Sequence, residues 1–185
     1  MGDITQLIAR AREGDRAAFD RLFELLYPEL RRIAHSRLAR NVRDTLMDTT
    51  ALVHECYLKF SQAERLTPAD RVHFLSYAAT VMRSVIVDAA RAAQTQRRGG
   101  GDVEHVTLNT DVADAVARPE DEILDVHAAL EDLAKFDARL VKVVEMRYFG
   151  GMKDDEIAQV LDLTDRTVRR DWEKARLLLA KALRG

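Results

Sequence analysis

The amino-acid sequence predicts an all-α protein made of two small helical domains. Apolar residues recur at steps of three and four along most of the 185 residues, which is the period of amphipathic helices. Aromatic residues are only 6% of the chain, whereas Leu, Ala, Arg and Asp are abundant, and this composition favours helices. The period is lost between Asp102 and Pro119, where acidic residues dominate. We therefore expect domains at residues 1–95 and 120–185, joined by a flexible acidic linker at 96–119.

The first domain is expected to be a helical bundle. Gly14 breaks the first helix, and Asp15 is placed to cap the second. Because a Pro disfavours helical geometry in the residue before it, Tyr27-Pro28 is expected to end one helix or to begin another. The single Cys56 lies in an apolar helical pattern, which predicts a buried, reduced thiol. Helices are expected at residues 3–12, 15–26, 30–38, 49–60 and 74–93, with a turn at 41–48, a loop at 64–73 and a basic, glycine-rich break at 94–101.

The second domain is expected to be a four-helix unit. Its first helix begins near Glu120, Asp137 can cap the next, and Gly150-Gly151 ends it. A short apolar stripe at residues 157–161 and a short turn follow, and Thr164 or Asp165 is placed to cap the last helix. In that helix, steps of three and four put four residues on one face: Val168, Trp172, Ala175 and Leu179.

Two helices across a very short turn match the helix-turn-helix layout, in which the second helix lies in the DNA major groove. The faces outside the apolar one carry five basic residues, which are Arg166, Arg169, Arg170, Lys174 and Arg176. Since the formal net charge is −2, DNA binding requires such local positive charge. From periodicity alone, an ordinary surface helix pair with solvated charges remains an equal alternative.

Three motifs in register resemble extracytoplasmic-function (ECF) sigma factors of bacterial RNA polymerase. Residues 133–176, with the runs 147–151, 156–158 and 167–169, look like sigma region 4. Leu52-Val53-His54-Glu55 with Tyr57-Leu58 resembles sigma region 2, and residues 74–91 match the spacing of its following helix. The resemblance covers nearly the whole chain. It implies a non-catalytic alternative sigma factor that binds core RNA polymerase and directs promoter-specific initiation.

The resemblance also assigns site residues. It places Arg166, Thr167, Arg169 and Arg170 at the −35 element, with Lys174 and Arg176 further along the helix at phosphates. It places Tyr77, Arg83, Asp88 and Arg91 at the −10 element, although Asp88 and Arg91 could instead form a surface pair. It assigns polymerase binding to Asp48, Leu52, Val53, His54 and Glu55. In the family the linker runs through the RNA path of the polymerase, but a merely solvated spacer is nearly as good an interpretation of this one. Trp172 is interpreted as a core residue, because it falls in phase with Val168.

One departure from the family pattern suggests regulation. Family members usually carry adjacent acids just before the Leu-Val pair, whereas Thr50 and Ala51 stand there in this sequence. A phosphothreonine adds a charge of roughly −1.5 to −2 and acceptor oxygens suited to Arg. We therefore hypothesise that Thr50, or failing that Thr49, is phosphorylated by a Ser/Thr protein kinase to permit polymerase binding. The alternative is that both hydroxyls simply cap the helix.

Other classes of function find less support in the sequence. The five His residues have no metal-ligand spacing, and Gly99-Gly100-Gly101 follows no strand, so no enzyme, metal site or cofactor is expected. The sequence has neither a signal peptide nor a long apolar run, which predicts a cytoplasmic protein without a membrane partner. The runner-up function is a free-standing transcription regulator that binds DNA through residues 153–179. Whether an anti-sigma factor is a partner is left open.

Overall fold

The computed structural model describes residues 2–37, 46–62, 68–99 and 119–184, and every regular element within these ranges is helical, as predicted. Polar side chains cap the starts of several helices. Side-chain oxygens of Asp15, Asp48 and Asp70 accept hydrogen bonds from the backbone N–H three residues on, at 2.8 to 3.0 Å. The elements are α1 (Gly2–Arg12), α2 (Arg16–Arg37), α4 (Thr49–Gln62), α5 (Arg71–Gly99), α6 (Pro119–Val144), the π-helical turn η2 (Glu145–Phe149), α7 (Asp154–Leu161) and α8 (Asp165–Ala182).

The structure corrects the expectation for Tyr27-Pro28. Pro28 lies inside a single helix, α2, and neither ends nor begins one. An internal Pro costs about 3 kcal/mol in a helix. Leu26 and Leu30 on either side of it are buried in the core, and this burial holds the segment in helical form.

Helix α5 is longer at both ends than we predicted. We expected helix over residues 74–93, but α5 runs from Arg71 to Gly99. Asp70 caps its start, so residues 71–73 are helical and not part of a loop. Its end passes through the predicted basic break, because Gln and Arg are good helix formers and residues 71–98 contain no Gly. Residues 96–99 of the predicted linker are therefore helical, and residues 100–118 lie outside the described ranges, as do most of the turn at 41–48 and residues 64–67.

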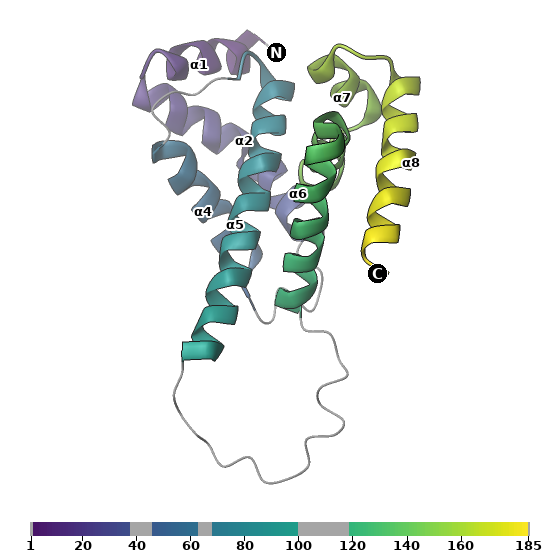
Figure 1. Cartoon of the computed structure of the whole chain (residues 1–185). Helices are drawn as coiled ribbons and strands as arrows, with labels where there is room; N and C mark the ends of the chain where they lie inside the picture. Colours follow the sequence, from purple (N-terminus) through teal and green to yellow (C-terminus); the bar gives the residue numbers. More distant parts are fainter. Residues whose placement is uncertain (1, 38–45, 63–67, 100–118, 185) are drawn as a thin grey trace.

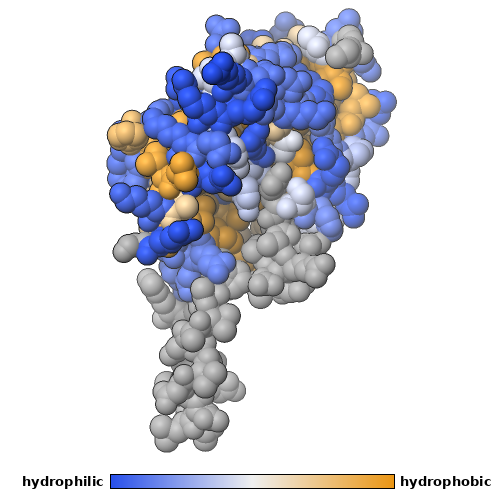
Figure 2. All heavy atoms as spheres, turned by 90° about the vertical axis from the view of Figure 1, so that its right-hand side faces the viewer, coloured by the Kyte–Doolittle hydropathy of each residue, from blue (hydrophilic) through white to orange (hydrophobic). Residues whose placement is uncertain are grey.

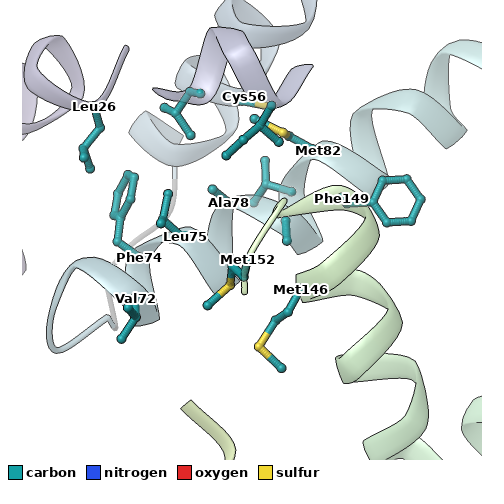
Figure 3. Close-up of a cluster of buried hydrophobic side chains, with 14 of the residues drawn as sticks. Leu26, Cys56, Val72, Phe74, Leu75, Ala78, Met82, Met146, Phe149 and Met152 are labelled. Atoms are coloured by element: carbon teal, nitrogen blue, oxygen red, sulfur yellow. The ribbon is translucent and has the colours of Figure 1, made fainter. Parts of the chain in front are cut away.

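Helix α5 is the central element of the molecule (Figure 1). It packs against α4 on one side and against α6, η2 and α7 on the other, while α8 lies on the outer side of α6. Buried side chains from the two predicted domains form one continuous cluster, part of which Figure 3 shows. The domain boundaries stay a prediction, but the two parts of the chain pack against each other.

Candidate nucleic-acid interface

The helix-turn-helix consists of α7, a three-residue turn and α8. Asp162 adopts a left-handed conformation with φ 53°, which ends α7, and the N–H of Leu163 bonds the carbonyl of Ala158 at 2.9 Å. Of the two predicted caps for α8, the structure selects Thr164, whose hydroxyl accepts from the N–H of Thr167 at 3.3 Å. The turn therefore fixes the angle between the two helices with bonds of its own.

Helix α8 has a buried side and an exposed side. Val168 and Ala175 are fully buried, and Trp172 and Leu179 pack against the core, as the spacing predicted. The guanidinium of Arg147 lies 5.0 Å from the centre of the Trp172 ring, which fixes the indole inside the domain. Asp171 is buried as well, so this acid points away from the exposed side.

The structure brings the six residues predicted for the −35 element together on the first three turns of α8. Most are well exposed, with between half and three quarters of the side chain accessible, and Thr167 is half-buried. Several pair with acids across or beside the helix: Arg169 with Asp154 at 3.5 Å, Lys174 with Asp137 at 3.6 Å and Arg176 with Glu173 at 2.7 Å. Exposed pairs contribute at most about 1 kcal/mol, so DNA phosphates can replace these acids. Figure 2 shows the side of the molecule on which α8 lies, and hydrophilic residues cover most of it.

The four residues predicted for the −10 element are split between two sides of α5. Tyr77 and Asp88 face α4, where the Tyr77 ring lies 5.3 Å from the Phe60 ring and Asp88 pairs with Lys59 at 2.6 Å. Arg83 and Arg91 face α6 instead. The alternative of an Asp88–Arg91 surface pair is not what forms, because each has a partner on a different helix.

Arg83 is buried, with 8% of its surface exposed, and three groups of the second half surround its guanidinium. Its nitrogens lie 2.7 Å from Glu145, 2.8 Å from Glu131 and 2.9 Å from Nδ1 of His127. Arg91 reaches Nε2 of the same His127 at 3.1 Å. We call Arg83, Arg91, His127, Glu131 and Glu145 the Arg83 cluster. Sequence reasoning missed its three members from the second half, because no local pattern marks a contact between segments 44 to 62 residues apart.

The residues predicted to bind polymerase divide by exposure. Leu52 and Val53 are fully buried and build the core of the first half. Asp48, His54 and Glu55 are exposed, and they are the members of the set whose side chains a partner can reach in this conformation.

The two threonines at the start of α4 also differ in exposure. Thr49 is buried, and its hydroxyl lies 3.5 Å from Nδ1 of His35. Thr50 is exposed. The capping role belongs to Asp48, whose carboxylate accepts from the N–H of Ala51 at 2.8 Å. The alternative that both hydroxyls cap the helix is therefore wrong.

A helix-turn-helix with a basic, exposed second helix, carried on an all-α chain, defines a helical DNA-binding protein. A family model described as "ECF sigma factor" matches residues 1–185, which is the full length of the sequence. The chain belongs to the ECF sigma factor family. No curated protein matches it.

Membership of this family gives the general function. ECF sigma factors are non-catalytic transcription initiation factors that associate with core RNA polymerase and promoter DNA. Within the described ranges, no group of three or more His, Cys, Asp or Glu side chains could hold a metal ion. Among the helices of the same ranges, none is both long enough and apolar enough to cross a membrane.

Proposed function

We propose that this ECF sigma factor reads the −35 element through α8 and engages core polymerase through the surface at the start of α4. The exposed basic side of α8 carries the first part of the proposal, because Arg can bond a guanine edge in a bidentate way worth about 1–3 kcal/mol. Arg166, Thr167, Arg169 and Arg170 are the specifying residues, and Lys174 and Arg176 contact phosphates. Tyr77, Asp88 and Arg91, with Arg83 once it is uncovered, act at the −10 element.

We further propose that phosphorylation of Thr50 switches on polymerase binding. The exposure of Thr50 supports this, because a kinase can reach an exposed residue, whereas Thr49 is buried. Asp48 already caps α4, so Thr50 is free of the capping role that the hydroxyl was expected to share. A phosphate at this position would lie at a helix N-terminus, where negative charge is favoured. It would supply the negative charge that adjacent acids supply in the sigma factors that this sequence resembles.

The test is association with bacterial core RNA polymerase followed by run-off transcription with no other sigma factor present. Thr50→Glu is expected to bind core enzyme roughly tenfold more tightly than the unmodified chain, which corresponds to about 1.4 kcal/mol. Thr50→Ala is the matched control and is expected to stay at the unmodified level under kinase treatment. The phosphorylation proposal fails if Thr50→Glu binds no better and Thr49→Glu does not either.

The same assay distinguishes a sigma factor from the runner-up function, a free-standing transcription regulator. A free-standing regulator would bind duplex DNA through α8 but would neither associate with core enzyme nor support initiation. Binding to core polymerase by any form of the chain excludes that function as the principal one.

A further inference from the structure

Asp154, the first residue of α7, lies between two arginines of the DNA-binding part of the chain. Its Oδ1 is buried and forms an ion pair with Nη2 of Arg147, which belongs to η2. Its Oδ2 lies 3.5 Å from Nε of Arg169 on α8. Because α7 packs against α8, this single carboxylate joins the element before the helix-turn-helix to the helix proposed to read DNA (Figure 1).

Asp154 is fixed in place by its surroundings. Its side chain is 23% exposed, and its partner Arg147 lies 5.0 Å from the centre of the Trp172 ring, which packs against the core. One turn further along α7, Ile157 is fully buried and anchors the helix. The carboxylate therefore has little freedom to follow a mobile side chain, and Arg169 has to adapt to it.

The two arginines are close enough to share this acid. Burial is the largest cause that lowers the pKa of Arg147, and the positive charge of Arg169 acts in the same direction, whereas Glu173 opposes it. The two guanidinium groups thus repel each other, and the carboxylate between them compensates both charges. Without Asp154, Arg169 would be repelled by Arg147 and would have no acid against its Nε.

The contact with Asp154 suits base recognition by Arg169, because it engages Nε and leaves the terminal nitrogens for another partner. The side chain of Arg169 is 66% exposed, so DNA can reach these nitrogens while the pair stays formed. A bidentate bond to O6 and N7 of guanine requires a guanidinium held in one plane. The pair of Arg176 with Glu173 differs, because there an exposed acid lies 2.7 Å from a terminal nitrogen, Nη2.

We propose that Asp154 is a positioning residue for promoter recognition, which holds the guanidinium of Arg169 in the orientation that reads a guanine of the −35 element. The inference rests on the proposed function, since it assumes that Arg169 contacts a base. Ordering a long side chain before binding removes an entropy cost, which corresponds to roughly threefold to tenfold in affinity for the correct base. A carboxylate near DNA also repels phosphates, so Asp154 raises specificity and not overall affinity.

The test measures base preference with a pool of DNA duplexes that carry a randomised stretch. The full-length chain, with and without Thr50→Glu, is mixed with bacterial core RNA polymerase, and the bound duplexes are sequenced. We expect guanine to be enriched at one position, and Arg169→Ala to lose that enrichment. In Asp154→Asn the guanine preference at the same position is expected to fall roughly threefold to tenfold. Total binding to the pool is expected to stay the same or to increase, because a negative charge near the phosphates is removed.

The matched control is Asp155→Asn, which removes the same charge from the next residue, an exposed one. It is expected to leave the base preference unchanged. Asp154→Ala is a second variant, which removes the carboxylate without a cost in helix propensity and is expected to show the same loss as Asp154→Asn. Helicity by circular dichroism checks that each variant is folded.

A double-mutant cycle separates positioning from a merely structural role. Arg169→Lys keeps the positive charge but lacks the planar guanidinium, so adding Asp154→Asn to it is expected to change the base preference no further. A guanine preference that survives in both Asp154 variants, or in Arg169→Ala, overturns the inference. A second loss of the same size in the Arg169→Lys background does so too. If no form enriches any base at any position, the proposed function itself is contradicted.

Discussion

Asp171 is a buried acid inside the helix-turn-helix, with 3% of its side chain exposed. Nε of Arg139 lies 2.8 Å from its Oδ2, although the angle is not that of a hydrogen bond, and Arg170 lies 3.8 Å from its Oδ1. A buried carboxylate depends on such neighbours, because its desolvation is otherwise uncompensated. The residue thus links α6 to α8 and holds the exposed side of α8 outward.

We expect Arg139→Gln to lower the free energy of unfolding by about 2 kcal/mol, below the 3–5 kcal/mol of a fully buried pair because Arg139 is half exposed. Arg176→Gln, which breaks an exposed pair on the same helix, is expected to cost under about 0.5 kcal/mol. Urea denaturation of both variants measures the difference. Adding Asp171→Asn to Arg139→Gln should recover part of the loss, and equal losses in the two single variants would contradict this role.

Single residues show where sequence reasoning succeeds and where it stops. Apolar periodicity identified Val168 and Ala175 as core positions, and Cys56 is fully buried as predicted, with burial raising the pKa of its thiol to about 12. Arg83 follows no apolar pattern, so nothing local showed that a charged side chain would be buried. Its environment comes from groups far away in the sequence, which periodicity does not address.

At the scale of elements, the sequence allowed several side chains that cap helices to be predicted. Asp15, Asp137 and Thr164 were expected as caps, and each of them accepts a backbone hydrogen bond. Asp137 does so at a kink inside α6, where its own backbone is non-helical, with φ −155° and ψ 92°. Pro28 was misjudged, because its local cost of a few kcal/mol was weighed without the packing that overrides it. The run 94–99 was misjudged, because its later glycines outweighed the good helix formers that precede Gly99.

The cap of α8 leads to a prediction about the stability of this helix and its binding to promoter DNA. Thr164→Ala removes the acceptor for the N–H of Thr167, and the loss of such a cap costs about 1 kcal/mol. Because Thr167 and its neighbours are the proposed base-contacting residues, fraying of this turn should also weaken promoter binding. Thermal unfolding and a filter-binding assay on promoter DNA measure the two effects.

Thr164→Ser keeps the hydroxyl acceptor and is the control for the cap. It is expected to retain both the stability and the DNA affinity of the unmodified chain. Should Thr164→Ala bind promoter DNA as well as Thr164→Ser does, the first turn of α8 does not take part in recognition.

At the scale of the molecule, the sequence predicted two helical parts but not their contact. The apolar faces of α5 and of η2 are visible as periodic residues, yet periodicity does not say which face covers which. The long acidic stretch suggested separation, whereas the halves pack together along α5. A Cβ placed on Gly150 would lie 3.0 Å from the Cβ of Ala79, and the Arg83 cluster also joins the halves. Both are properties of the assembled fold.

His127 makes the packing of the two halves against each other sensitive to pH. We call the packed arrangement the closed state, and an arrangement with the halves separated the open state. Burial, and then the charge of Arg83, lowers the pKa of His127 below its ordinary value of 6.5. The other charged groups facing the ring are Glu131 on α6 and Arg91 and Asp88 on α5, and their effects do not reverse this direction. The closed state therefore favours the neutral imidazole, whose one unprotonated ring nitrogen can accept a hydrogen bond from one of the two arginines.

The sign of the effect follows from proton binding in the two states. In the open state His127 is solvated and takes up a proton as the pH falls through about 6.5, whereas in the closed state it stays neutral to lower pH. Acidification below about pH 6.5 thus favours opening, by at most about tenfold per pH unit for one proton. Above that pH both states are neutral at this residue, and the closed state keeps its full stability.

We therefore expect the radius of gyration to increase between pH 7.5 and pH 5.5 while helicity is retained. In His127→Gln this dependence is expected to disappear, because the amide cannot be protonated in that range. His54→Gln, at an exposed position on α4, is the control and is expected to respond as the unmodified chain does. If His127→Gln expands on acidification as much as His54→Gln, the transition arises from other groups and His127 does not set it.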